Sequence, residues 1–326
     1  MGSFSGLISL LSLIALATIN IGDKAPSFTD GAQWVKGKAP DVGNSITIVE
    51  LWKTSCGICK GQIPHLSSLQ KIYGNRISIV ALNSEPIDVL NQFMKEHNDE
   101  ILYTVGHVSK EVMSQFIEGT PGVPYCYIID KKGNILWQCH AAAIDDMLEK
   151  ILSGPVDIEK LKKIAALEKA LDGALETDKT ESITQAVKDL LAFDPGNAKA
   201  LEVWINIAKY DEEPGLIKAM FDMVPMSDLS AYNANKFAAM LISDSDFAFR
   251  YPEAAIKFAD YALKKQPENS EYINTYAKLL YSLGDLETAI VWQKKAVKFA
   301  PDNKDYQAAL KYYLLLKKLR SGISAK

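Results

Sequence analysis

The stretch "WKTSCGICKGQIPHL", residues 52–66, places Cys56 and Cys59 three positions apart, and they are two of the four cysteines in the chain. Two thiols at this spacing can close a disulfide, supply two ligands to a metal ion, or remain as small apolar groups in a core. The elements that hold the pair decide between these chemistries.

A strand precedes the pair and a helix is expected to begin with it. "SITIVELW", residues 45–52, holds no turn residues and is rich in β-branched side chains, which is typical of a buried central strand. A thiol at a helix start lies among unpaired backbone N–H groups, which can lower its pKa from ~8.5 to between ~3.5 and ~7.5. We expect Cys56 to be that thiol. Cys59, one turn later on the same helix face, can reach it and should be more shielded.

Composition limits the class of protein. A chain of 326 residues has room for roughly two domains, and 48% apolar with 23% charged residues is typical of a globular protein. The net charge of -4, with interleaved signs, gives no basic patch and argues against nucleic acid as a partner. Four cysteines are too few for a disulfide-built scaffold.

The N-terminal residues suggest export. "LISLLSLIALA", residues 7–17, ends in a small-x-small pattern like a signal-peptidase site and is too short for an ordinary membrane span. Against this, "MGSFSG" has no Lys or Arg to form a positive leader end. We expect residues 1–19 to be a signal peptide cleaved after Ala17 or an apolar anchor that stays attached. The protein would then be exported, to the periplasm or another extracytoplasmic compartment.

The pattern of elements changes near residue 155. Before it, short apolar runs such as "ITIVELW", "ISIVALN" and "YCYIID" alternate with helical stretches, which indicates an α/β sheet with crossover helices. From Asp157 onward the sequence predicts helices and turns only, and "SGPVD", residues 153–157, is typical of a linker. The expected domains are residues 20–154 and 157–326.

The helical half contains a repeat. Residues 251–269 align with residues 285–303 at an offset of 34, which matches Ala255 with Ala289, Ile256 with Ile290, Ala262 with Ala296 and Pro267 with Pro301. The period, the small residues at helix crossings and the closing proline resemble the tetratricopeptide repeat, and Ala277 and Gly284 also fit its pattern. A plain helical bundle is the alternative. Stacked helix pairs commonly bind a protein, so we expect a protein partner for this domain.

The N-terminal half resembles thioredoxin-fold disulfide oxidoreductases. The resemblance rests on a strand followed by W-x-x-x-C-G-x-C-K, a proline five residues after the second cysteine, and a later "GVP". It is closest to the exported TlpA-type branch and covers about residues 20–152. It implies an α/β thioredoxin-like fold, a Cys56–Cys59 disulfide and two-electron exchange with protein thiols or disulfides, without a cofactor. It also implies an electron donor, and favours a reductase over an oxidase.

The resemblance assigns roles to two prolines. Pro64 matches a proline that kinks the active-site helix, since it removes a backbone hydrogen bond. Pro124 matches a cis-proline beside the active disulfide, which leaves the backbone of Val123 available to an extended substrate. A trans proline at a strand entry is the alternative.

Glu50 lies in the middle of the apolar strand at residues 45–52, where burial of an ionised carboxylate is costly, and Trp52 ends that strand. Glu50 occupies the position of a buried acid in thioredoxin, where a raised pKa would let it accept the proton of Cys59. The alternative is a glutamate at a strand end that reaches solvent. Trp52 is grouped with Val123 and Pro124 as substrate-binding, although packing beneath the site is the favoured interpretation.

The sequence departs from the family pattern at Ser55, before the first cysteine, and at Ile58, between the two. The intervening residues tune redox potential, so no potential is transferred from thioredoxin, and the loss of the family's tryptophan leaves the substrate range open. Cys126 and Cys139 flank a predicted hairpin turn, "DKKGN". We expect buried reduced thiols, with a second disulfide as the alternative, because one residue of register decides whether they face each other.

Two rival functions are retained. A CxxC pair with His65, His107 or His140 would suit copper or zinc, but no second CxxC is present. Alternatively, the helical repeats are the active part, and the thioredoxin-like fold is a passive module. The combination of Cys56, Cys59, Glu50, Pro64 and Pro124 favours the enzyme. We therefore expect a thiol-disulfide oxidoreductase.

Overall fold

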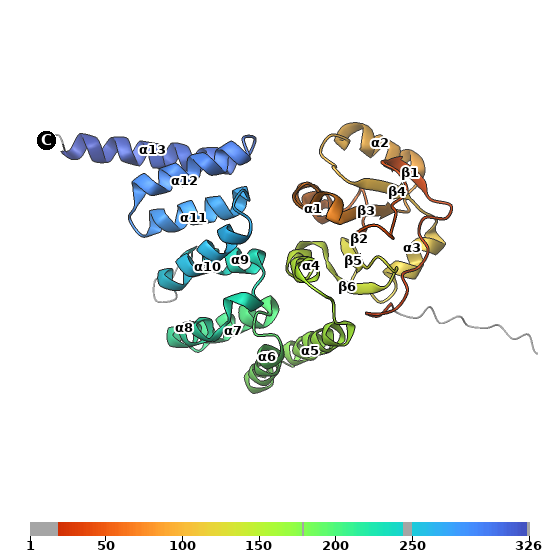
Figure 1. Cartoon of the computed structure of the whole chain (residues 1–326), viewed down its shortest axis with the longest axis horizontal. Helices are drawn as coiled ribbons and strands as arrows, with labels where there is room; N and C mark the ends of the chain where they lie inside the picture. The colour runs from red at the N-terminus through yellow and green to blue at the C-terminus, as the bar shows by residue number, and fades with distance from the viewer. Residues whose placement is uncertain (1–18, 178, 244–249, 325–326) are drawn as a thin grey trace, which may run out of the picture. The chain divides into compact units, whose positions relative to one another are not determined.

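A computed structural model describes residues 19–177, 179–243 and 250–324 (Figure 1). The chain divides into two compact units, Met1–Ile144 and Asp145–Lys326. Except for Ile19, the apolar segment expected at residues 1–19 lies outside the described residues, so its cleavage or anchoring stays a prediction. Within the described part of the chain, no helix has the length and apolar character that a membrane crossing requires.

A six-stranded mixed sheet forms the centre of the first unit. Its strand order is β1-β4-β3-β2-β5-β6, with β2, β3 and β4 parallel and the remaining pairings antiparallel. The strands are β1 (Gln33–Lys36), β2 (Ile46–Leu51), β3 (Ile77–Asn83), β4 (Thr104–His107), β5 (Tyr125–Ile129) and β6 (Ile135–His140). The α/β class expected for this half is confirmed.

Helices cover both faces of this sheet. They are α1 (Gly57–Tyr73), α2 (Ile87–His97) and α3 (Lys110–Ile117), and Figure 1 shows α1 and α3 on opposite sides. Val49 and Leu51 of β2 pack with Phe116 of α3 in one apolar cluster. Because side chains alternate along a strand, Glu50 points to the other face, which α1 covers.

The β5–β6 hairpin forms at the predicted turn. The Asp130 carboxylate accepts hydrogen bonds from the backbone N–H groups of Lys132, at 2.8 Å, and Asn134, at 2.7 Å. Gly133 has a φ of 80°, a conformation that glycine adopts without a steric penalty. This turn sets the register in which the two strands pair.

The second unit is almost entirely helical. Its helices are α4 (Ile144–Ser153, which begins one residue before the unit), α5 (Ile158–Glu176), α6 (Thr180–Phe193), α7 (Ala198–Tyr210), α8 (Pro214–Met223), α9 (Ala231–Ser243), α10 (Pro252–Lys265), α11 (Ser270–Ser282), α12 (Leu286–Phe299) and α13 (Lys304–Ser324). The starts of α10 and α12 are 34 residues apart (286 − 252), as are those of α11 and α13 (304 − 270). The spacing found in the sequence is therefore a spacing of helices. The aligned alanines of α10 and α12 are fully buried.

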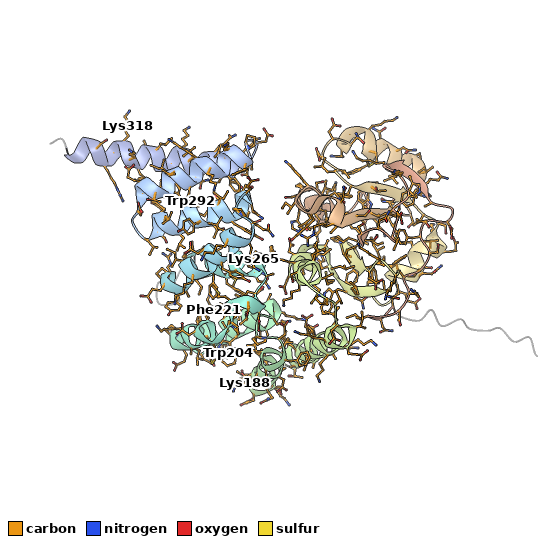
Figure 2. The ribbon with its side chains drawn as sticks, in the orientation of Figure 1. Lys188, Trp204, Phe221, Lys265, Trp292 and Lys318 are labelled. Atoms are coloured by element: carbon orange, nitrogen blue, oxygen red, sulfur yellow. A yellow bond between two sulfur atoms is a disulfide. The ribbon has the colours of Figure 1, made fainter. Side chains whose placement is uncertain are left out.

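Aromatic side chains fill the core of the helical unit. Phe221 of α8 contacts Phe237 of α9 and Phe258 of α10, with ring centroids 5.3 and 5.1 Å apart. Trp204 donates its indole N–H to the carbonyl of Leu216 at 3.3 Å. Figure 2 shows Trp204, Phe221 and Trp292 at successive levels of this unit. These contacts give the unit a core of its own.

Helix α4 falls within the helical unit, although the linker expected from the sequence follows it at residues 153–157. The Glu149 carboxylate accepts the backbone N–H groups of Ala231, at 2.8 Å, and Tyr232, at 3.3 Å, which start α9. Lys150 lies 3.2 Å from Asp194, at the end of α6. These polar contacts tie α4 to helices that follow it in the chain.

Candidate active site

Cys56 and Cys59 form a disulfide at the start of α1, with Cα atoms 5.2 Å apart. Cys56 is the N-cap residue, and its sulfur accepts the backbone N–H of Cys59 at 3.1 Å. Cys59 is fully buried, whereas Cys56 is partly exposed. The helix start therefore presents one sulfur to solvent, next to unpaired N–H groups, and encloses the other.

The Val123–Pro124 peptide bond is cis, as expected from the sequence. The carbonyl oxygen of Val123 lies 3.9 Å from the sulfur of Cys56. Val123 is partly exposed, while Pro124 is buried. The backbone before the proline is thus available to an extended chain that lies across Cys56.

Glu50 is enclosed within the unit, with 1% of its surface exposed. Burial raises the pKa of Glu50 to about 8, because desolvation disfavours the carboxylate. This excludes the alternative of a strand-end glutamate that reaches solvent. Burial raises the pKa of Tyr103 as well, and the charges of Glu50 and Cys126 add to the effect, so these three groups are electrostatic neighbours.

Glu85 organises the loop before Cys56, and we did not predict it. Its carboxylate accepts the backbone N–H of Thr54 at 2.6 Å, the Ser55 hydroxyl at 3.2 Å and the amide of Asn83 at 2.8 Å. Partial burial opposes ionisation, but the hydrogen bonds outweigh it and lower the pKa of Glu85. The available signal was the polar run "NSE" directly after a buried strand, at the edge of the sheet where the carboxyl ends of parallel strands meet.

The remaining predicted residues divide between packing and surface. Trp52 is 2% exposed and packs edge-on against Phe93 of α2, at 5.3 Å between centroids. Trp52 therefore packs beneath the site and does not bind substrate, because a buried ring offers no surface to a protein. Pro64 lies inside α1, which continues past it. The Ser55 hydroxyl donates a hydrogen bond to the Glu85 carboxylate, and Ile58 is 62% exposed beside the disulfide.

Cys126 and Cys139 are not joined in a disulfide; they lie directly opposite one another in β5 and β6. Cys126 is buried and Cys139 is partly exposed. Of the histidines considered as metal ligands, His65 lies in α1, His107 ends β4 and His140 ends β6. Among the described residues, no group of three or more His, Cys, Asp or Glu side chains is arranged to hold a metal ion.

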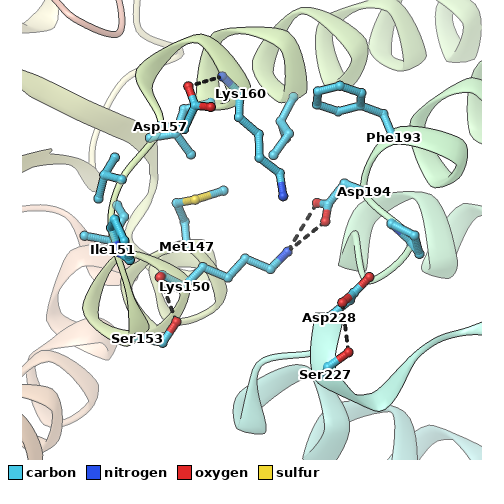
Figure 3. A pocket seen from close by; sticks show the side chains of 15 residues that line it. Met147, Lys150, Ile151, Ser153, Asp157, Lys160, Phe193, Asp194, Ser227 and Asp228 are labelled. Atoms are coloured by element: carbon cyan, nitrogen blue, oxygen red, sulfur yellow. Dashed lines mark hydrogen bonds and ion pairs between the residues drawn. The ribbon is translucent and has the colours of Figure 1, made fainter.

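A pocket of about 310 Å³ opens in the helical unit, between α4, α5, the end of α6 and the short 3-10 turn Met226–Asp228 (Figure 3). Lys150 and Lys160 extend into it, and Lys150 is 3.2 Å from both Asp146 and Asp194. Burial alone would lower the pKa of Lys150, but the two carboxylates outweigh this effect and raise it. The partly buried Lys150 ammonium is therefore held by the protein's own acids.

Comparisons with known proteins match the first unit. Residues 21–138 fit the family model described as the AhpC/TSA family. The thioredoxin-like protein YneN of Bacillus subtilis is 22% identical over 144 residues, which are 43% of this chain and 81% of that protein. A Chlorobium tepidum structure assigned as a thiol:disulfide interchange protein DsbE is 25% identical, with a TM-score of 0.32, over 38% of this chain and 86% of that one. A thiol:disulfide interchange protein from Bacteroides sp. is 17% identical, with a TM-score of 0.35, over 43% and 94%.

The family match covers the sheet and the helix that carries Cys56 and Cys59, which is the part of the chain where the disulfide and the cis-proline meet. The first unit therefore has a thioredoxin-like α/β fold, and its match to this family points to a redox enzyme of the thiol-disulfide oxidoreductase kind.

Proposed function

We propose that this protein reduces disulfides of protein clients in an extracytoplasmic compartment. The main support is the Cys56–Cys59 disulfide at a helix start, against the carbonyl of Val123 before a cis-proline. The apolar run at residues 7–17 supports export. The exposed Ile58 gives an apolar contact for a client beside the reacting sulfur.

The reaction proceeds by two exchanges. The Cys56 thiolate attacks a client disulfide, forms a mixed disulfide and releases one client thiol. Cys59 then loses its proton and attacks the Cys56 sulfur, which releases the second client thiol and leaves the disulfide seen here. Two electrons pass from the protein to the client, and a donor dithiol must return them.

Glu50 is positioned to assist the second exchange. It projects toward the face of the sheet that α1 covers, and Cys59 is the buried cysteine of α1. With a pKa of about 8, its carboxylate is populated at neutral to mildly alkaline pH and can accept the Cys59 proton, directly or through water.

The helical unit docks a protein partner in this proposal, as tetratricopeptide-like helix pairs do. The 34-residue spacing of α10 to α13 supports that architecture. Helix α13 also presents an apolar stripe to solvent. Tyr312, Leu315 and Leu319 are 49%, 53% and 53% exposed, and their spacing places them on one helix face.

The decisive experiment traps the mixed disulfide. In Cys59→Ser, attack by Cys56 proceeds but resolution does not, so covalent complexes with clients should accumulate and dissolve with reductant. Cys56→Ser is the matched control and should trap far less, because Cys59 is buried. Non-reducing electrophoresis of both variants, beside metal analysis of the wild type, gives the result. Equal trapping would reverse the assigned roles, and bound copper or zinc without trapping would refute the enzyme.

A further inference from the structure

A second pair of thiols lies in the sheet of the first unit. Glu50 of β2 is the register partner of Cys126 in β5, and Cys126 is the register partner of Cys139 in β6. Neighbouring strands place directly opposed residues on the same face. Tyr127 of β5 belongs to the apolar cluster under α3, so Cys126 and Cys139 lie on the opposite face. The pairing of β5 with β6 alone brings these two thiols together.

The strand pairing sets a separation that suits a disulfide. In an antiparallel ladder, directly opposed residues alternate between hydrogen-bonded and non-hydrogen-bonded pairs. The N–H of Ala141 donates to the carbonyl of Pro124 at 3.5 Å, so Pro124 and Ala141 are a hydrogen-bonded pair. Because the kinds alternate, Cys126 and Cys139 are again a hydrogen-bonded pair, with Cα atoms typically about 5.5 Å apart. Disulfides span Cα separations of about 4.4 to 6.8 Å. Closure must still draw the Cβ atoms together by about 1 Å, which favours a bond that is readily reduced.

The two thiols differ in access. Cys126 is fully buried, whereas Cys139 is partly exposed on β6, the edge strand of the sheet. A reagent from solvent therefore meets Cys139 first, and Cys126 is the shielded neighbour. The Cys56 and Cys59 pair likewise has one accessible and one shielded sulfur.

We propose that Cys126 and Cys139 are a second redox site, a dithiol that exchanges with small disulfides and closes reversibly across β5 and β6. The Cys139 thiolate attacks a small disulfide RSSR, forms a mixed disulfide and expels one thiolate. The Cys126 sulfur then attacks Cys139 and expels the second thiolate, which takes up the Cys126 proton. The protein loses two electrons, and RSSR becomes two RSH molecules, one protonated by Cys126 and the other by the proton that Cys139 released to solvent.

The test uses full-length protein and glutathione disulfide as the probe. Reduced protein is equilibrated in glutathione buffers of increasing oxidation, acid-quenched, alkylated and digested with trypsin for mass spectrometry. Cleavage at Lys131 and Lys132 separates Cys126 from Cys139, while Cys56 and Cys59 stay in one peptide, residues 54–60. We expect a linked peptide pair containing Cys126 and Cys139 that disappears with dithiothreitol. The yield should be the same in a Cys56→Ser, Cys59→Ser double variant.

Two single variants test the order of attack. Cys126→Ser should retain a glutathione adduct on Cys139 at several times the wild-type level, because no second thiol resolves it. Cys139→Ser should leave Cys126 reduced. The proposal is overturned if wild type retains as much adduct as Cys126→Ser, if both thiols stay alkylatable throughout, or if Cys139 links only to a second molecule. Circular dichroism of the oxidised sample checks that the protein is folded. A Cys126–Cys139 disulfide that forms only in denaturant also overturns the proposal.

Discussion

Glu50 is a carboxylic acid enclosed by the sheet, and its ionisation should be visible in stability. Its pKa is about 8 in the folded protein, against an ordinary value of 4.5. The folded state therefore binds the proton more tightly than the unfolded state, and stability falls as pH rises from about 4.5 to about 8. The Glu50→Gln variant has no ionisable group at this position, so it does not lose this stability as pH rises. Its stability relative to wild type should rise by roughly 3 to 4 kcal/mol between pH 5 and pH 8, then level off.

Calorimetric unfolding midpoints of both proteins at several pH values give this difference. Asp130→Asn is not a suitable control, because Asp130 holds the β5–β6 turn. Glu118→Gln is suitable, since Glu118 is an exposed carboxyl at the end of α3. A Glu50→Gln difference that is constant from pH 5 to pH 9 would contradict the raised pKa.

The same variant tests the proton step. In wild type, the rate at which a bound client is released from Cys56 should rise with pH as Glu50 ionises near pH 8. Glu50→Gln should lower this rate about a hundredfold or more, as expected for loss of a general base, and flatten its pH dependence. Single-turnover kinetics with a defined disulfide client measure both. Unchanged rates across neutral pH would assign Glu50 to structure alone.

The site residues that were predictable from sequence are those whose role depends on their neighbours along the chain. Cys56 caps α1 because it lies in the short loop between β2 and that helix, and Pro124 follows a "GV" that enters a strand. Glu85 was missed because its contact with Thr54 spans 31 positions and depends on the parallel pairing of β2 and β3. The opposition of Cys126 and Cys139 was left open because it depends on register.

At the scale of elements, long strands were predictable and short ones were not. β2, β3 and β5 are buried runs of β-branched and aromatic residues, so composition alone indicates them. β1 and β4 have four residues each, and β4 contains Gly106. A glycine there leaves room for the ring of Trp34, because an added Cβ would lie 2.6 Å from it. Such strands form through tertiary pairing, which local propensity does not register.

Helix α4 allows a test of the buried charges in the helical unit. Lys150→Met leaves Asp146 and Asp194 without their cation, and should destabilise the unit by ~3 kcal/mol, or roughly 6–12 °C in midpoint. The loss should shrink at acidic pH, because burial raises the pKa of Asp146 and its carboxylate is neutralised by protonation there. Thermal unfolding followed by circular dichroism measures the change.

The matched control for Lys150 is Lys162, whose ion pair with Glu159 is 2.9 Å long but exposed, with 48% and 81% of the two side chains accessible. Exposed pairs of this kind contribute little, so Lys162→Met should shift the midpoint by no more than the equivalent of about 1 kcal/mol. Equal shifts in the two variants would show that the Lys150 pair contributes no more than a surface pair.

At the scale of the whole molecule, the question is whether the helical unit contributes to client capture. Changing Leu315 and Leu319 of α13 to serine removes the exposed apolar stripe while leaving the helix core intact, since both side chains are more than half exposed. In the Cys59→Ser background, these changes should reduce trapping of protein clients several-fold. Reduction of a small disulfide by the otherwise wild-type chain carrying them should be unchanged, because Cys56 and Cys59 lie in the other unit.

Lys311 and Lys318, exposed on the same helix, provide the control when both are changed to serine. A loss of trapping in the leucine variant alone would locate docking at the apolar stripe, because serine enters the same helix in both proteins. A parallel loss in both would instead point to charge or helix stability. If client trapping is unaffected by the leucine changes while the helix stays folded by circular dichroism, the α13 stripe does not dock clients. Capture then depends on contacts made by the thioredoxin-like unit, where Ile58 is the exposed apolar residue between the cysteines.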